Sequence, residues 1–432
     1  MADAVKSGNI GEHSELLAMA RIILDGYLEL GLPDGSDSQE VGSRMLVFSV
    51  SRTPPLGTKY SLIKNKKTEE LEVNERIVYY SAGEDVLSTI EPTGISKRLC
   101  SRSELSAAAV ELKKQLTYWS SAKFKTEKAA RKKAEMAAGA ESDSKALQSE
   151  HSQRILDLLG LTGLRAKSGA KSDLYLTIEY SGQRVPQGFS VKSQMGSKSC
   201  LVNHSGATIF KYEIQNTTLA DAGLVEERFI YNKASLAKRP ESASKVKRGP
   251  ATVVPALLCE PGVTIKYHSV VNDTFKDSLE MIDGRFPEAL AMVILQRFKT
   301  GESRIANLAA DEDLQKFLEG AGMSPRISAN YLTEKLKDLL RKFAMGMQAG
   351  SAWKDRAEVQ GGWVLVIKEG KVVGYRFDST DAFRTYLLNH TMIDTPSTSR
   401  VPKKSPNGRV GRVFAQDDKL FMTLSLIVKF TQ

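Results

Sequence analysis

The sequence has few cysteines and no long apolar segment, and these absences exclude several classes of protein. Its three cysteines, Cys100, Cys200 and Cys259, match neither a zinc-binding spacing nor a disulfide framework, which favours a reducing cytoplasm. No run of about 18 apolar residues occurs, so we expect no membrane-spanning helix and no membrane partner. The polar N-terminus lacks the apolar core of an export signal. Together these features predict a cytoplasmic location.

The catalytic motifs of several common enzyme classes are also missing. The five histidines show no HExxH pattern and no other metal-binding spacing, which disfavours a metalloprotease or a histidine-based nuclease. The sequence contains neither a Walker loop nor a GxSxG motif, so an NTPase and a serine hydrolase have no support.

What the sequence does contain is an excess of basic residues. It has 61 Lys and Arg against 51 Asp and Glu, a net charge of +10 over 432 residues. A nucleic acid partner explains this balance best, because each phosphate that is neutralised releases a counterion. An anionic membrane fits less well, since no basic amphipathic helix with an aromatic face appears. A basic, solubilising surface is the alternative.

The hydrophobic pattern predicts a mixed α/β (α+β) chain in which helices flank a central mixed sheet. Apolar residues from Leu16 to Leu30 recur at helical spacing and predict a helix over residues 14–32. Strand-like segments follow from Met45, Thr58 and Glu75. Later elements are helices over 104–137 and through most of 287–348, a hairpin over 362–377, and a last strand from Lys419. We expect residues 1–100 to form a smaller N-terminal region, a candidate for DNA contact, and residues 101–432 to form the catalytic and DNA-binding domain.

The most informative segment is a predicted hairpin between Lys171 and Gln194. Side chains alternate faces along a strand, so Asp173 shares a face with Tyr175 and Thr177, opposite Leu174 and Leu176. In the second strand Phe189 and Val191 point one way, and Ser190, Lys192 and Gln194 point the other way. With the turn centred near Arg184, Asp173 lies opposite Met195, and it meets Lys192 and Gln194 on one side of the hairpin.

An acid and a lysine in this arrangement suit magnesium-dependent cleavage of a phosphodiester. Mg²⁺ prefers a few carboxylate oxygens together with waters and substrate phosphate. Asp173 can supply a carboxylate and Val191 its backbone carbonyl, while Lys192 orients or deprotonates the attacking water. For a second carboxylate we favour Glu150 over Glu213. Glu179 is excluded, because it lies roughly 20 Å along the strand from Asp173. A surface hairpin with ordinary polar residues is the alternative.

Three stretches of this sequence resemble the HpaII-like family of type II restriction endonucleases, within the PD-(D/E)xK nuclease fold. They are KSDLYLTIEY, GFSVKSQMGSKSCLVNHSGATIFKYEI, and DAFRTYLLNHTMIDTPSTSR followed by LFMTLSLIVKF. The resemblance covers most of residues 145–432. It implies that Asp173 is the metal-binding aspartate and Lys192 the catalytic lysine. Ser190 stands where the wider superfamily has Asp or Glu, which leaves the second metal ligand open; some restriction enzymes bring that acid from a helix elsewhere.

The resemblance also implies a restriction-endonuclease-like core and Mg²⁺-dependent cleavage of double-stranded DNA at a short palindrome, CCGG or related to it. A homodimer suits symmetric cutting of a palindrome. The enzyme would act in a bacterial cytoplasm beside a cognate DNA methyltransferase that protects host DNA. A non-catalytic DNA-binding or regulatory protein is the main alternative function, and an RNA-processing nuclease is another.

Two segments are candidates for DNA contact. The first contains Lys198, Asn203, Ser205 and Thr208 and directly follows the catalytic strand. The second contains Ser397, Thr398, Arg400 and Lys403 within a stretch that has no acid. Hydroxyl groups and arginine suit contacts with phosphates and base edges. The alternatives are a capped helix N-terminus for the first segment and a flexible basic loop for the second.

Overall fold

The structure is a computed structural model of the 432-residue chain. It describes residues 7–34, 44–64, 67–91, 95–137, 147–164, 172–180, 182–196, 199–203, 206–216, 254–255, 257–259, 261–353, 361–367, 370–377, 380–395, 413–417 and 419–431. Within these residues no helix is both long enough and apolar enough to cross a membrane.

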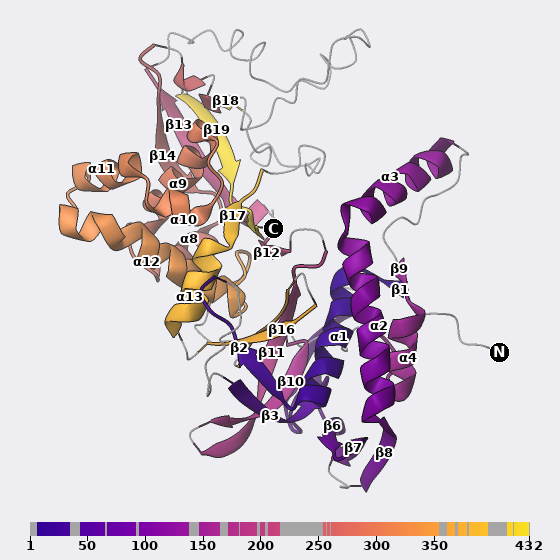
Figure 1. The fold of residues 1–432 in the computed structure, drawn as a ribbon. Coiled ribbons are helices and arrows are strands. Elements are labelled where there is room, and N and C mark those ends of the chain that lie inside the picture. The colour runs from indigo at the N-terminus through magenta and orange to yellow at the C-terminus, as the bar shows by residue number, and fades with distance from the viewer. Residues whose placement is uncertain are drawn as a thin grey trace. The chain divides into compact units, whose positions relative to one another are not determined.

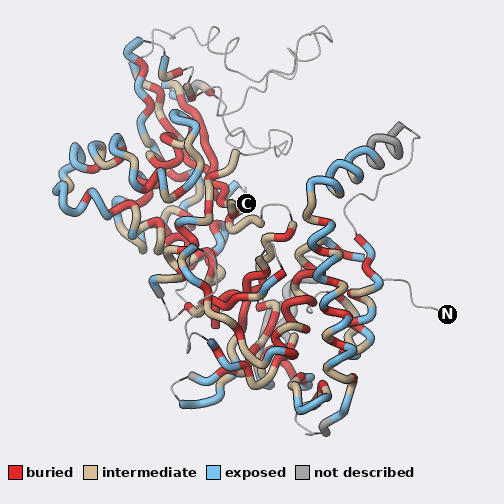
Figure 2. Tube along the Cα trace, in the orientation of Figure 1, coloured by how far each residue is buried: buried red, intermediate tan, exposed pale blue. Residues whose placement is uncertain are grey.

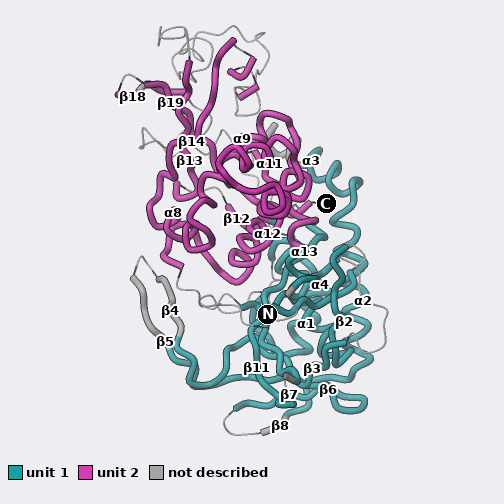
Figure 3. The backbone as a smooth tube through the Cα atoms, turned by 90° about the vertical axis from the view of Figure 1, so that its left-hand side faces the viewer, with its two compact units in different colours: residues 1–199, 357–386 teal, residues 200–356, 387–432 magenta. Residues whose placement is uncertain are grey.

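The chain forms two compact units, and each is built from separate stretches of sequence (Figure 3). Unit 1 contains Met1–Ser199 and Ala357–Tyr386, and unit 2 contains Cys200–Arg356 and Leu387–Gln432. The predicted boundary at residue 100 does not coincide with this division. Strands from both sides of that position pair in one sheet, so the N-terminal strands complete the sheet of unit 1.

Unit 1 is built around a nine-stranded mixed sheet, as the hydrophobic pattern predicted in outline. In spatial order its strands are β10 (Leu174–Tyr180), β11 (Gln183–Ser193), β15 (Gly362–Val366), β16 (Val372–Arg376), β2 (Tyr27–Leu30), β3 (Arg44–Ser51), β6 (Arg76–Ala82), β7 (Asp85–Glu91) and β8 (Ile95–Ser101). The pairs β11–β15 and β16–β2 are parallel, and the others are antiparallel. Strand β10 also pairs with β3, so the first six strands in this order form a closed ring in which each strand pairs with two others.

Three helices pack together on one face of this sheet (Figure 1). They are α1 (Ile10–Asp25), α2 (Arg102–Ser120) and α4 (Glu150–Leu158). Figure 2 shows α1 buried along nearly its whole length, and its Leu16, Leu17 and Ile22 pack with Phe189 and Val364 of the sheet. Burial of these apolar side chains is the main stabilising contribution to the unit.

The first helix is shorter than the predicted helix over residues 14–32. It begins with a capping box between Asn9 and Glu12 and ends at Gly26, whose φ of 71° is in the left-handed region. The chain then continues as β2. Tyr27 and Leu30 fit a helical spacing, but the glycine ends the helix before them.

Smaller elements complete unit 1. The predicted helix over 104–137 is divided at Ser121 into α2 and α3 (Ala122–Ala137). The short strands β1 (Ser7–Gly8) and β9 (Leu147–Gln148) pair with each other, as do β4 (Lys59–Lys64) and β5 (Lys67–Glu72). The last helix, α13 (Thr380–Asn389), begins in unit 1 and continues past the boundary with unit 2.

Unit 2 combines two small sheets with a group of helices. Its strands are β12 (Cys200–Val202), β13 (Ile209–Gln215), β14 (Thr264–Val270), β17 (Thr391–Ile393), β18 (Val413–Gln416), β19 (Lys419–Ser425) and β20 (Val428–Phe430). Its helices are η1 (Gly206–Thr208), α8 (Asp273–Glu280), α9 (Phe286–Thr300), α10 (Ile305–Ala309), α11 (Glu312–Gly320) and α12 (Pro325–Ala344). The helical character predicted for 287–348 is confirmed.

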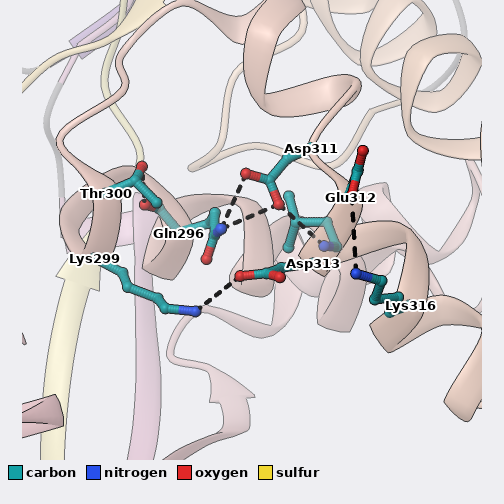
Figure 4. Close-up of polar contacts among 8 residues, drawn as sticks. Gln296, Lys299, Thr300, Asp311, Glu312, Asp313 and Lys316 are labelled. Carbon is teal, nitrogen blue, oxygen red and sulfur yellow. Dashed lines mark hydrogen bonds and ion pairs between the residues drawn. The ribbon is translucent and has the colours of Figure 1, made fainter.

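A polar network joins α9 to α11 in unit 2 (Figure 4). Asp311 caps the N-terminus of α11 through the backbone N–H of Leu314, and both of its carboxylate oxygens accept from Gln296 Nε2 at 3.0 Å. Lys299 forms an ion pair with Asp313 at 3.1 Å. The acids at the start of α11 therefore serve helix capping and helix–helix packing.

Candidate active site

The carboxylate of Asp173 is held against the second strand of the predicted hairpin. Asp173 lies just before β10, and its backbone N–H donates to the carbonyl of Phe189 at 2.9 Å. One carboxylate oxygen, Oδ2, accepts from Val191 N at 2.7 Å and from Ser190 Oγ at 3.0 Å. The carboxylate is therefore fixed at the end of β10, beside the middle of β11.

The register of the hairpin differs from the one predicted. Leu174 pairs with Phe189 and Tyr180 with Gln183, so the strands are joined between Tyr180 and Gln183 and the turn is not centred near Arg184. Gly182 has a φ of 77°, which a tight turn of this kind requires. The correction moves Asp173 from a place opposite Met195 to a place beside Ser190, which brings it closer to Lys192.

Lys192 reaches Asp173 through the hydroxyl of Ser190. Its ammonium donates to Ser190 Oγ at 2.8 Å, and that hydroxyl donates to Asp173. The ammonium also lies 5.6 Å from the centre of the Trp363 ring, on the neighbouring strand β15. Of the three residues expected to meet on this face, Asp173, Lys192 and Gln194, the first two are joined here through Ser190. Ser190 is only 4% exposed, so its hydroxyl is an internal link between the two charged groups.

The two other residues predicted from β11 and its end have different surroundings. Gln194 donates through Nε2 to the hydroxyl of Tyr386, on α13, at 3.3 Å. It is therefore directed toward α13. Val191 donates its backbone N–H to Asp173, and its side chain is buried in the core. Because the N–H and C=O of a strand residue point to the same edge, the Val191 carbonyl also faces the edge where Asp173 lies.

Glu150 does not join this group. It is the first residue of α4, exposed to solvent, where an acid interacts favourably with the helix dipole. The structure instead places Glu15, on α1, where the charge of Asp173 acts on its carboxylate. Glu15 is half-buried, and burial raises its pKa to about 8, assisted by the negative charge of Asp173. The positive charges of Arg52 and Lys192 oppose this rise.

Glu15 was not among the predicted site residues, although the sequence does contain a signal for it. Glu15 stands within HSELLAMA, a helical segment that is otherwise almost entirely apolar or small. An acid in a helix that is buried nearly all round is rare unless it has a partner. Its partner here is a second carboxylate, and two such acids side by side attract a cation.

The residues at this site fit a magnesium ion. Asp173 and Glu15 can supply carboxylate oxygens, and Val191 can supply a backbone oxygen, which are the ligands that Mg²⁺ prefers beside waters and phosphate. In the part of the chain that the structure describes, no group of three or more His, Cys, Asp or Glu could hold a metal. A site with few protein ligands is usual for an ion that is also bound by substrate phosphate.

The predicted DNA contacts are only partly within the described residues. Asn203 is exposed directly after β12. Thr208 is 1% exposed, and its hydroxyl is 3.0 Å from that of Ser425, so its role is internal and the predicted contact with DNA is corrected. The remaining predicted residues, Lys198, Ser205, Ser397, Thr398, Arg400 and Lys403, lie outside the described part of the chain.

A carboxylate at the start of one strand, a lysine on the neighbouring strand and a second carboxylate from a helix form a site of the kind that hydrolytic nucleases use. Residues 120–430 match the family model described as HpaII restriction endonuclease. The type II restriction enzyme HpaII of Haemophilus parainfluenzae is 28% identical over 278 residues, which cover 64% of this chain and 69% of that enzyme. No solved structure matches. The chain is thus a DNA-cleaving hydrolase, and it belongs to the HpaII restriction endonuclease family.

Proposed function

We propose that this enzyme cuts both strands of DNA at a short, CCGG-containing palindrome in a reaction that requires Mg²⁺. The observation that carries the proposal is the chain of contacts from Lys192 through Ser190 to Asp173, with Glu15 beside it. The family membership supports cleavage of DNA, and the net charge of +10 suits a polyanionic substrate.

Each residue of the site has a distinct task in this proposal. Asp173, Glu15 and the Val191 carbonyl hold the divalent ion, which when bound polarises the scissile phosphate. The ammonium of Lys192 orients the attacking water and stabilises the charge that develops on the phosphate. Ser190 keeps the ammonium of Lys192 within reach of Asp173. The burial of Ser190 keeps bulk water away from this link.

The biological setting follows from the same proposal. A palindrome is cut symmetrically most simply by a homodimer, in which each subunit attacks one strand. An enzyme that cuts CCGG in a bacterial cytoplasm needs a cognate methyltransferase that protects the host DNA.

The test uses plasmid DNA of known sequence, with and without Mg²⁺. We expect discrete fragments only when Mg²⁺ is present, and the sequenced ends should locate one palindrome. Asp173→Asn and Lys192→Met should each lower the single-turnover cleavage rate by about a hundredfold to ten-thousandfold, while binding of duplex DNA is retained. Normal cleavage by either variant would contradict the site, and a mobility shift without any cleavage by the wild type would contradict the reaction.

A further inference from the structure

A second half-buried cation, Arg52, lies directly after strand β3. Ser51 of β3 pairs with Tyr175 of β10, so Arg52 lies beside the start of β10, the end of that strand at which Asp173 is found. Its Nη1 donates to the carbonyl of Gly163 at 2.7 Å, and its Nη2 donates to the carbonyl of Leu164. These two carbonyls follow α4 and precede Asp173 in the chain. One guanidinium therefore ties the N-terminal strand β3 to the segment that leads into the hairpin.

The same guanidinium acts electrostatically on both carboxylates of the site. Burial lowers the pKa of Arg52, and the negative charges of Glu15 and Asp173 oppose this effect. Conversely, the positive charge of Arg52 opposes the rise in the pKa of Glu15. Arg52 and Lys192 are thus two half-buried cations whose charges act on Glu15.

The hydrogen bonds of Arg52 have a consequence for the metal site. In the described part of the chain, both go to backbone carbonyls and neither goes to a carboxylate. A direct ion pair would occupy the oxygens that a divalent ion needs. A guanidinium fixed by carbonyls supplies a positive charge close to Glu15 and Asp173 and leaves their oxygens available.

We propose that Arg52 is a positioning residue of the catalytic centre, which holds Glu15 and Asp173 side by side in the geometry that binds the divalent ion. This inference rests on the proposed Mg²⁺-dependent cleavage at Asp173 and Lys192. It means that the catalytic centre extends beyond residues 120–430, the part that matches the family, because Glu15 and Arg52 both precede that range.

The test compares Arg52→Met and Arg52→Lys with Arg44→Met as the matched control. Arg44 lies on the same strand, is 54% exposed and pairs with Glu29, so its loss removes an arginine away from the site. Each protein is assayed for single-turnover cleavage at saturating Mg²⁺, for binding of duplex DNA without Mg²⁺, and for thermal unfolding.

We expect Arg52→Met to lower the maximal cleavage rate about tenfold to a hundredfold and to leave DNA binding unchanged. Arg52→Lys, which keeps the charge, should recover most of the rate, and Arg44→Met should cleave normally. A merely structural role would lower the melting temperature and DNA binding together with the rate, and lysine would not rescue it. That result overturns the proposal, as does Arg52→Met with a wild-type rate.

Two further outcomes keep the test decisive. If Arg52→Met does not fold, Arg52→Lys decides: a rate within about threefold of wild type supports the proposal, and a loss beyond about a hundredfold in the folded variant overturns it. Failure of the underlying reaction is recognised separately, because Asp173→Asn would then cleave normally or the wild type would need no Mg²⁺.

Discussion

Replacing Glu15 with Gln should stabilise the metal-free protein while it abolishes cleavage. Burial and the charge of Asp173 raise the pKa of Glu15 from 4.5 to about 8. In this window the folded state binds a proton that the unfolded state has released, so the free energy of unfolding falls as the pH rises from 4.5 through 8. Gln carries no charge, so the variant lacks this dependence.

The size of the effect follows from the shift. A change in pKa from 4.5 to about 8 corresponds to about 5 kcal/mol if it is expressed in full. Water and side-chain rearrangement screen part of the repulsion, so we expect Glu15→Gln to raise the free energy of unfolding by about 2–3 kcal/mol at about pH 9. At about pH 5 the two proteins should differ little, because Glu15 is then protonated in the folded state.

The assay is urea denaturation at both pH values, in the presence and absence of Mg²⁺. Mg²⁺ should stabilise the wild type at alkaline pH and should have much less effect on Glu15→Gln, which lacks one ligand. Glu111→Gln, an exposed position on α2 that pairs with Lys114, is the control and should match the wild type. The reasoning is refuted if Glu15→Gln shows no gain at alkaline pH, or if it cleaves DNA at the wild-type rate.

Two further predictions concern the scaffold of unit 1. His13 is fully buried between Ser152 and the carbonyl of Leu147, and burial lowers its pKa from 6.5. As the pH falls below 6.5, the unfolded state therefore binds a proton that the folded state does not bind, and the free energy of unfolding falls. His13→Phe should remove this dependence of the free energy of unfolding on pH, whereas a substitution of the exposed His268 should leave it in place. A Cβ at Gly362, where φ is 153°, would lie 1.8 Å from the carbonyl oxygen of Tyr375. We therefore expect Gly362→Ala to lower the melting temperature sharply and to lower cleavage with it, since β15 supports β11; Gly320→Ala, where the space is open, should do neither.

Local patterns were enough to predict the parts of the site that lie on one hairpin. The alternation of side chains places Ser190 and Lys192 on one face of β11, and the structure has this arrangement. The register was wrong because the turn is closed by Gly182, and the Ser-Gly pair that signals this turn in the sequence was passed over for Arg184. The predicted register is five residues from the observed one, and an odd shift reverses the face that Asp173 shares with Ser190 and Lys192. The alternation of apolar and polar side chains therefore predicted the meeting of Asp173 and Lys192, whereas the predicted register did not.

The second acid could not be found by local reasoning. Glu15 reaches Asp173 only because α1 packs across the sheet, and that contact joins parts of the chain far apart in sequence. The search for a second carboxylate stayed close to the hairpin and therefore selected Glu150. The same limit applies to the division of the chain, because β2 pairs with β16 and β3 pairs with β10, strands that come from much later residues.

The parallel pairing of β11 with β15 sets an order of events during synthesis. The strand that carries Lys192 leaves the ribosome long before the strand that must lie beside it, and all of residues 200–356 are made in between. At cellular elongation rates this interval lasts about 10–30 s. A chain that has been made only as far as residue 356 therefore lacks the strand that pairs with the one carrying Lys192, and the proposed site is incomplete until β15 is made.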